Sequence, residues 1–308
     1  MFKKWISKPV LIMAAIGLLF TTTAQAAPAK LTGSIDVDGS STVFPLTEAV
    51  AEEFGKIHKG VRVPVGVSGT GGGFKRFCEG ETAISNASRP IKDSEKKACK
   101  EKGIQYLELT VAYDGLSVIV SKDNKFVDKL TVEELNAIFK PESIVKTWKD
   151  VRKNWPDETI KIFSPGSDSG TFDYFTEAIN GKAQSSRNDK QMSFSEDDNT
   201  LVSGIANDRY AIGYFGYSYY EENKSKLKVV AIDAGKGAIA PSPKTIANGT
   251  YAPLSRPLFI YVNKKALTRP EVKEFTQFYL QNAGKLSKEI GFVALSDNWY
   301  KTQLKRIK

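Results

Sequence analysis

Three times in this chain a short β-rich segment runs into a turn of Ser, Thr, Gly and Asp residues, and a segment with helical apolar spacing follows. The turns lie at 38–42, 68–73 and 164–169. Strands that alternate with helices favour α/β layers built on mainly parallel sheets. In such sheets the strand-to-helix turns gather at the carboxyl ends of the strands, where ligands bind. The pattern predicts an α/β chain whose three polar turns lie close together.

The second turn carries the strongest local signal. Ser68 begins a run that contains four glycines, and Phe74, Phe77 and Cys78 supply the buried face of the helix that follows. Glycine lets a backbone approach a ligand, and a helix start offers unpaired N–H donors and the positive end of the dipole. A flexible turn is the alternative for any Ser/Gly run. A tetrahedral oxyanion requires many hydrogen-bond donors. Three such turns together would direct many N–H and O–H groups at one point.

The rest of the chain continues the alternation of strands and helices. Strands are predicted at 34–38, 61–67, 83–87, 159–163, 211–217, 228–232 and 258–262, and helices at 44–58, 93–102, from 131, at 170–179, at 201–206 and, as the last clear one, from 270. Residues 106–120 predict two strand segments joined by a bend at Asp114-Gly115, and residues 180–199 a long loop. We expect the chain to form two lobes and to cross between them twice, near residues 112–116 and 253–257.

Residues 1–26 have the pattern of a secretory signal peptide. Three lysines precede an apolar run at 9–20, and the segment closes in Ala24-Gln25-Ala26. The run is too short to span a bilayer comfortably, and cleavage before Ala27 is expected. No Cys lies near that point, so a lipid anchor is not expected. The sequence predicts a secreted, periplasmic chain.

Charge and cysteine content narrow the function classes. The formal net charge is +9, with lysines scattered among the acids, which indicates a solvated surface that mildly favours anions and argues against nucleic acid as a partner. Cys78 and Cys99 are the only cysteines, and in an exported chain this spacing predicts a disulfide rather than a metal site. His58 is the only histidine, so a Ser-His-Asp triad would have to use it; a surface histidine is the alternative.

Arg89 follows Ala87-Ser88 at the end of another predicted strand. Its guanidinium has the bidentate fork that suits phosphate or sulfate oxygens. A surface arginine before Pro90 is the other interpretation, and the spacing alone does not separate the two.

Four segments together resemble the periplasmic phosphate-binding proteins of ABC-type phosphate importers: DGSSTVFPLTEAVAEEF (38–54), VSGTGGGFKRFCEGETAISNASRPIK (67–92), SPGSDSGTF (164–172) and AIGYFGYSYY (211–220). The resemblance covers nearly all of the chain after residue 26. It implies the type II periplasmic-binding-protein fold, in which two α/β lobes enclose a ligand cleft. With the crossovers above, lobe 1 is 27–113 plus 255–308 and lobe 2 is 114–254.

The resemblance also implies a function and a set of contacts. A monomer would capture inorganic phosphate, without a cofactor or bond chemistry, and present it to a membrane permease, a role tied to phosphate starvation. The implied phosphate contacts are Ser41, Thr42, Val43 through its backbone N–H, Ser68, Ser169, Gly170 and Thr171. Arg89 stands where many relatives have an aspartate, and we add it as a contact.

That missing aspartate leaves selectivity open. A carboxylate accepts a hydrogen bond from protonated phosphate but repels fully ionised sulfate. Asp38 and Asp168 are possible substitutes, although aspartates in such turns more often cap helices or close Asx turns. Sulfate or another oxyanion is therefore an alternative ligand. A secreted phosphatase is a further alternative, but the chain lacks the metal-ligand clusters and paired bases of such enzymes.

Overall fold

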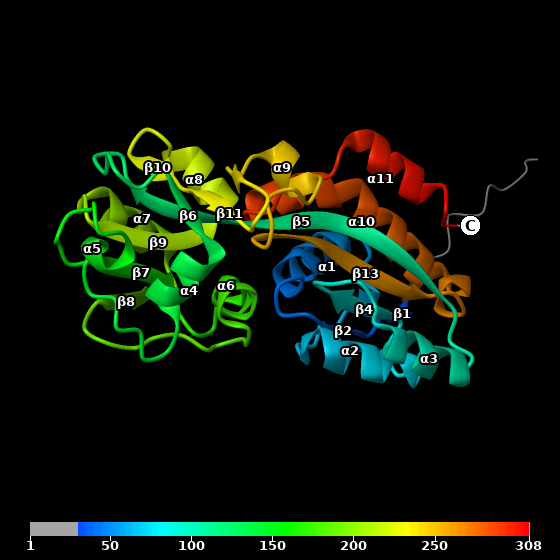
Figure 1. The fold of residues 1–308 in the computed structure, drawn as a ribbon. Coiled ribbons are helices and arrows are strands. Elements are labelled where there is room, and N and C mark those ends of the chain that lie inside the picture. Colours follow the sequence, from blue (N-terminus) through cyan, green and yellow to red (C-terminus); the bar gives the residue numbers. More distant parts are fainter. Residues whose placement is uncertain (1–29, 308) are drawn as a thin grey trace, which may run out of the picture. The chain divides into compact units, whose positions relative to one another are not determined.

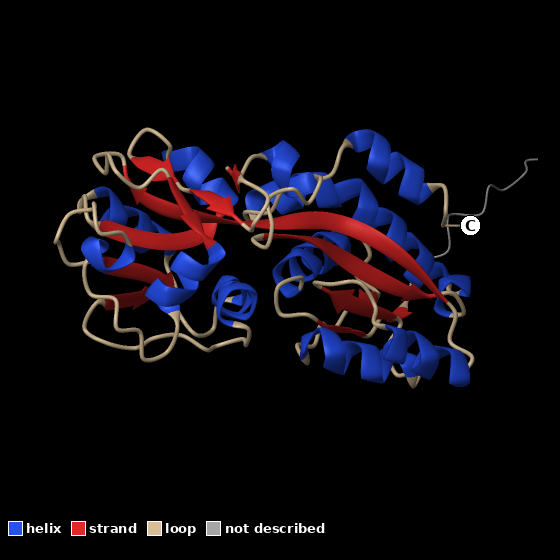
Figure 2. Ribbon diagram, viewed as in Figure 1, coloured by secondary structure: helices blue, strands red, loops and turns tan. Residues whose placement is uncertain are grey.

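The computed structural model describes residues 30–307 (Figures 1 and 2). Within them an eight-stranded mixed sheet has the order β2-β4-β13-β5-β9-β7-β8, and β10 also pairs with β5. The strands are β1 (Gly33–Ser34), β2 (Val37–Gly39), β3 (Val61–Arg62), β4 (Ile84–Ala87), β5 (Tyr106–Ser121), β6 (Lys129–Thr131), β7 (Lys161–Pro165), β8 (Met192–Ser195), β9 (Ala211–Gly216), β10 (Leu227–Val229), β11 (Ala231–Asp233), β12 (Ala238–Ile239) and β13 (Ser255–Asn263).

The helices cover this sheet on both faces. They are α1 (Phe44–Ile57), α2 (Gly69–Cys78), α3 (Asp93–Glu101), α4 (Val132–Phe139), α5 (Trp148–Val151), α6 (Gly170–Asn180), α7 (Asp198–Ala206), α8 (Tyr217–Asn223), α9 (Pro243–Ala247), the short 3₁₀ helix η1 (Ala266–Thr268), α10 (Pro270–Glu289) and α11 (Asp297–Leu304). No helix in residues 30–307 is long and apolar enough to cross a membrane.

The long strand β5 joins the two parts of the sheet. It runs antiparallel to β13 over residues 106–115 and then pairs with β9 over residues 116–120 (Figure 1). The prediction of two strand segments joined by a bend at Asp114-Gly115 is therefore wrong, because β5 is one continuous strand that includes both residues. Gly115 serves packing instead, since a Cβ there would lie 2.5 Å from the side chain of Ile246 in α9.

Alternate residues of β13 face two different helix layers. Leu258, Ile260 and Val262 belong to the core beneath α1 and α10, while Phe259 and Tyr261 pack with α2 and α3. This is the period-2 pattern of a strand buried on both faces. The sheet positions the strand-to-helix turns after β2 and after β7. The third turn that the alternation of the sequence predicts follows β3, which pairs with β1 in a separate two-stranded sheet.

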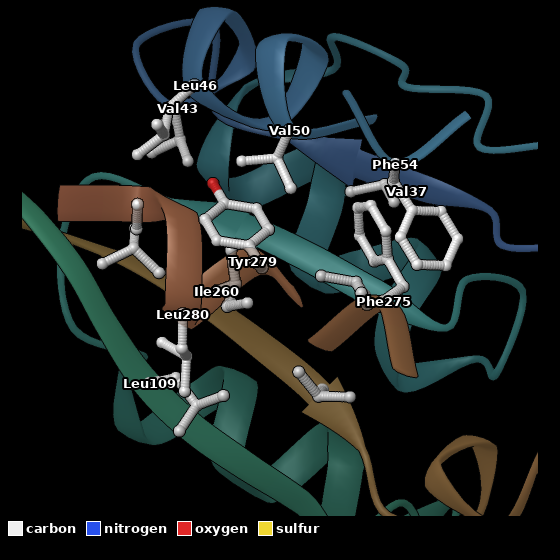
Figure 3. Packing of buried hydrophobic residues seen from close by; sticks show 14 of the residues in the cluster. Val37, Val43, Leu46, Val50, Phe54, Leu109, Ile260, Phe275, Tyr279 and Leu280 are labelled. Carbon is white, nitrogen blue, oxygen red and sulfur yellow. The ribbon is translucent and has the colours of Figure 1, made fainter. Parts of the chain in front are cut away.

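The core under α1 anchors the first of these turns. Val50 and Phe54 pack against Phe275 and Tyr279 of α10, with Phe54 and Phe275 edge to face at a centroid distance of 5.2 Å (Figure 3). The Tyr279 hydroxyl also lies 2.9 Å from Thr47 Oγ1, which is within hydrogen-bond distance. These buried contacts hold α1 in place, and its N-terminal end remains free of them.

Several other expectations differ from the structure. The region 180–199 is not a loop throughout, because it contains β8, which pairs parallel with β7, and the first residues of α7. The helix from Pro270 is not the last, since α11 follows it. The predicted signal peptide lies outside the described residues.

Cys78 and Cys99 form a disulfide, as the sequence predicts, and it joins α2 to α3. Replacing both cysteines with alanine should lower the free energy of unfolding by roughly 3 kcal/mol, because the bridge closes a loop in the unfolded chain. Urea unfolding of the variant and of the oxidised protein measures the difference. Identical midpoints and slopes would show that the bridge contributes nothing.

Candidate functional site

The first turn leads from β2 into α1. The Ser40 N–H donates to Asn86 O at 3.0 Å, and the Phe44 N–H donates to Ser40 O at the same distance. Between them, the N–H groups of residues 41–43 donate to no other residue in the described part of the chain. This helix start therefore offers free donors at the positive end of a 14-residue helix.

The second turn is tied to the first by Asp38. Its Oδ1 accepts the N–H of Gly39 at 2.7 Å and that of Ser68 at 3.0 Å, and its Oδ2 accepts from Arg76. Burial alone would raise the pKa of Asp38, but the hydrogen bonds from Arg76, Ser68 and Gly39 outweigh it and leave the pKa lowered. The carboxylate thus joins the first and second turns. This role is structural, but it is neither the helix cap nor the Asx turn that the sequence suggests for this aspartate.

The third turn ends at the start of α6. Ser169 is the N-cap of this helix, and its Oγ accepts the Thr171 N–H at 3.2 Å. A Cβ on Gly170 would lie 3.3 Å from both Cα and Oγ1 of Thr42. The first and third turns are therefore in close contact, and glycine allows this approach.

Two adjoining pockets lie where these turns meet. The first, of roughly 570 Å³, is lined by Ser41, Thr42 and Arg89, by Arg256, and by the α2 start at residues 69–71. The second, of roughly 440 Å³, shares Ser41 and Thr42 and adds Ser169, Gly170 and Thr171. The starts of α1 and α2 and two guanidinium groups border the first pocket, and the starts of α1 and α6 border the second. Donors of both kinds suit an anion.

The predicted contacts do not all face this space. Ser41, Thr42, Arg89, Ser169, Gly170 and Thr171 line one or both pockets. Val43 is fully buried behind the first turn, where only its N–H remains available. Ser68 lines neither pocket, and its N–H is already taken by Asp38. The structure brings together the first and third turns more closely than the second.

Arg89 lies in the pocket wall but is strongly paired. Its Nη1 and Nη2 donate to the two carboxylate oxygens of Glu95 at 2.8 and 2.7 Å, and Nη1 also donates to Pro90 O at 3.1 Å. The Arg89 side chain is 30% exposed. Neither interpretation from the sequence foresaw this bidentate ion pair, which occupies much of the donor capacity of Arg89.

Sequence reasoning missed a second arginine, Arg256, at the start of β13. Its Nη2 donates to Thr42 Oγ1 at 2.8 Å, and its Nε and Nη2 both donate to Asp114 Oδ2 at 3.2 Å. Its Cζ lies 3.5 Å from the centroid of the Tyr174 ring. The signal that could have found it is an arginine beside a proline at the predicted second crossover.

The electrostatics of the pockets are mixed. Arg89, Lys92 and Arg256 face Asp173 and Glu177 in the first pocket. Burial raises the pKa of the Asp173 carboxyl, and burial likewise raises that of Asp114, which the charge of Arg256 partly offsets.

Asp168, the other possible substitute for the missing aspartate, borders the second pocket beside Glu196 and Asp198. Its N–H donates to Glu196 Oε1 at 3.2 Å. Within residues 30–307 no group of His, Cys, Asp and Glu could hold a metal ion.

Comparisons with known proteins show which family the chain belongs to. Residues 24–283 match the family model of the PBP superfamily domain. The chain is 50% identical to protein SphX of Synechococcus elongatus, over 98% of this chain and 90% of that one, and 46% identical to the phosphate-binding protein PstS of Staphylococcus saprophyticus, over 89% and 84%.

A solved structure, that of a possible phosphate-binding protein from Planctomyces limnophilus, is 48% identical, covers 90% of this chain and 98% of its own, and superposes with a TM-score of 0.86. The type II binding-protein fold expected from the sequence is therefore confirmed. The chain belongs to the PBP superfamily and, within it, to the family of PstS-type phosphate-binding proteins.

Proposed function

We propose that this protein captures inorganic phosphate in the space between its polar turns and delivers it to an ABC-type import permease. The observation that carries the proposal is the contact between the starts of α1 and α6, where unpaired N–H groups and the hydroxyls of Thr42 and Ser169 border one pocket. Such donors at helix starts are already directed at a tetrahedral oxyanion before it binds.

The proposed contacts are those that the sequence predicts, with the exception of Arg89. The first turn contributes Ser41, Thr42 and the Val43 N–H, and the third contributes Ser169, Gly170 and Thr171. Ser68 stays in the proposed set through its hydroxyl, since Asp38 accepts its N–H. Arg89, the remaining contact that the sequence predicts, is left out of the proposed set because Glu95 and Pro90 occupy most of its donors.

Binding is proposed to close two lobes, 27–113 plus 255–308 and 114–254, around the anion. Two large apolar clusters support this division: one draws its buried residues from 35–112 and 258–307, the other from 116–254. Between these clusters the chain crosses on β5 and β13. Two strands of this kind allow a hinge motion with little loss of packing.

The proposal includes a cellular setting. The N-terminal pattern of residues 1–26 supports export by a cleaved signal peptide, and the family is extracytoplasmic. We place the mature protein in the periplasm as a monomer that serves under phosphate starvation and does not bind nucleic acid.

Binding without catalysis is also part of the proposal. His58 caps the C-terminal end of α1, about 20 Å along the helix from the turn that borders the pocket, and its ring packs on Phe54. It cannot activate a serine at the other end. Turnover of p-nitrophenyl phosphate by the purified protein, with or without divalent metals, would contradict this.

Titration calorimetry on the mature chain tests the main proposal. We expect phosphate to bind with a stoichiometry of one and to keep its affinity when sulfate is added in excess, at both pH 5.5 and pH 8. Absence of phosphate binding would overturn the function. Equal competition by sulfate would make the protein a general oxyanion binder.

Replacing Ser169 with alanine should weaken phosphate binding by about tenfold, because one hydroxyl donor is lost. It should also cost about 1 kcal/mol of stability through the lost N-cap. Ser296→Ala is the matched control, since Ser296 caps α11 in the same way, through the Trp299 N–H, away from the pocket. Equal affinities of the two variants would remove Ser169 from the site.

A further inference from the structure

We propose that Arg256, rather than Arg89, is the guanidinium that binds the anion, and that Asp114 positions it. This inference rests on the proposed function and names the charged group that the sequence placed at Arg89. It follows from the contacts that hold Arg256 in the pocket wall.

Arg256 is built into the join between β5 and β13. It stands directly opposite Asp114 in the strand register, and both side chains are largely buried, with 13% and 4% exposed. A buried charged pair needs excellent geometry, because desolvation costs nearly as much as the attraction returns. The pair is therefore a poor choice for stability alone, and its position on the pocket gives it another use.

The contacts of Arg256 leave one edge of the guanidinium available. Nε and Nη2 are used by Asp114 and Thr42, while Nη1 donates to no other residue in the described range 30–307. One face of the group rests on the Tyr174 ring. Arg256 lines the first pocket, which shares Ser41 and Thr42 with the second, and its remaining N–H groups are free for an oxyanion there.

Arg256 also sets the direction of the Thr42 hydroxyl. Thr42 Oγ1 accepts a hydrogen bond from Arg256 Nη2, so the hydroxyl proton must be donated to another group. Thr42 lines the first pocket, which is the space open to that proton. A hydroxyl oriented in this way acts as a donor toward an anion. One arginine therefore supplies charge and orients a neighbouring donor.

The same arginine touches elements on both sides of the pocket. Thr42 belongs to the first turn, and Tyr174 belongs to α6. The Tyr174 hydroxyl donates to Pro253 O at 2.7 Å, just before β13. An anion bound to Arg256 would thus lie next to the first turn and α6, the elements that must come together when the lobes close. Arg89 lacks this position, since Glu95 and Pro90 hold its guanidinium.

Calorimetric titration with inorganic phosphate tests the assignment in the full mature protein. Arg256→Lys keeps the charge but loses the fork, so we expect affinity to fall about 100-fold. Arg89→Gln should change it by less than about threefold, because Arg89 is already paired. A loss confined to Arg89→Gln would overturn the inference, whereas a wild-type protein that binds no phosphate would overturn the proposed function instead.

Three further measurements separate binding from folding. In the wild-type protein, addition of phosphate should shift the side-chain NMR signals of Arg256; unchanged signals in a protein that binds phosphate would refute the assignment. Arg256→Lys combined with Thr42→Val should lose less affinity than the sum of the single changes; strict additivity would refute the orientation of Thr42. Asp114→Asn should weaken binding while Asp114→Glu restores part of it, and equal effects of the two would refute the positioning role.

Discussion

Replacing Asp38 with alanine should lower the free energy of unfolding by about 3 kcal/mol and weaken phosphate binding at the same time. The carboxylate is almost fully buried and accepts the N–H groups of Gly39 and Ser68 as well as Arg76. Without it, two backbone donors lose their partner. The first two turns would then lose the contact that sets their spacing.

The pH dependence of this effect has a definite sign. The folded-state pKa of Asp38 lies below the ordinary value, so its contribution is present above the ordinary carboxyl pKa of about 3.9 and is lost as the pH falls through the lowered value. The difference in unfolding free energy between wild type and Asp38→Ala should therefore shrink in strong acid.

Asp36→Ala is the matched control for Asp38→Ala. Asp36 lies two residues earlier and is exposed, and among the residues the structure describes its carboxylate accepts only a 3.4 Å hydrogen bond, from Ser34. Urea unfolding should leave it within about 0.5 kcal/mol of wild type. Similar losses in both variants, or a loss in Asp38→Ala that does not depend on pH, would contradict the role assigned to Asp38.

The sequence predicted those parts of the fold that depend on local signals. The capping box at Thr131 is present, with the Glu134 N–H donating to Thr131 Oγ1 at 3.1 Å and the Thr131 N–H donating back to Glu134 Oε2 at 2.8 Å. The helices from Phe44 and Gly170 also begin where expected. In each case the deciding interactions lie within a few residues.

Errors arose where distant residues decide the structure. Asp114-Gly115 has the composition of a turn, but Gly115 makes room for Ile246 and Asp114 pairs with Arg256, 142 residues away. The strand β8 was missed because its residues are partly exposed and form an outer strand of the sheet. Such pairings leave no periodicity in the local sequence.

In the candidate site, too, the residues found from the sequence depend on local signals, and the contacts that were missed depend on the folded structure. Its hydroxyls and glycines sit at strand ends and were found from the chain order. The ion pair of Arg89 with Glu95 spans only six residues, yet it depends on how the α3 start is placed against β4. Arg256 contacts Thr42 across 214 residues, so only the folded sheet reveals that contact.

Replacing Gly73, the last glycine of the run after Ser68, with alanine should disturb the packing of α2 on β2. A Cβ at Gly73 would lie 2.5 Å from the Gly39 Cα and 3.1 Å from Asp38 O, both of them backbone atoms that cannot move alone. We expect α2 to shift away from β2, with a loss of about 3 kcal/mol in unfolding free energy. Phosphate affinity should also fall, since the first turn follows β2 directly.

Gly71→Ala is the control within the same helix and the same chemistry. A Cβ at Gly71 would meet nothing closer than Arg89 Nη2 at 3.8 Å, and alanine favours the helix by up to about 1 kcal/mol. Urea unfolding should therefore rank Gly71→Ala at or above wild type and Gly73→Ala far below it. If instead Gly71→Ala alone lost phosphate binding while Gly73→Ala stayed stable, the glycines would serve approach to the ligand. The close contact between Gly73 and Gly39 favours packing as their main role in this run.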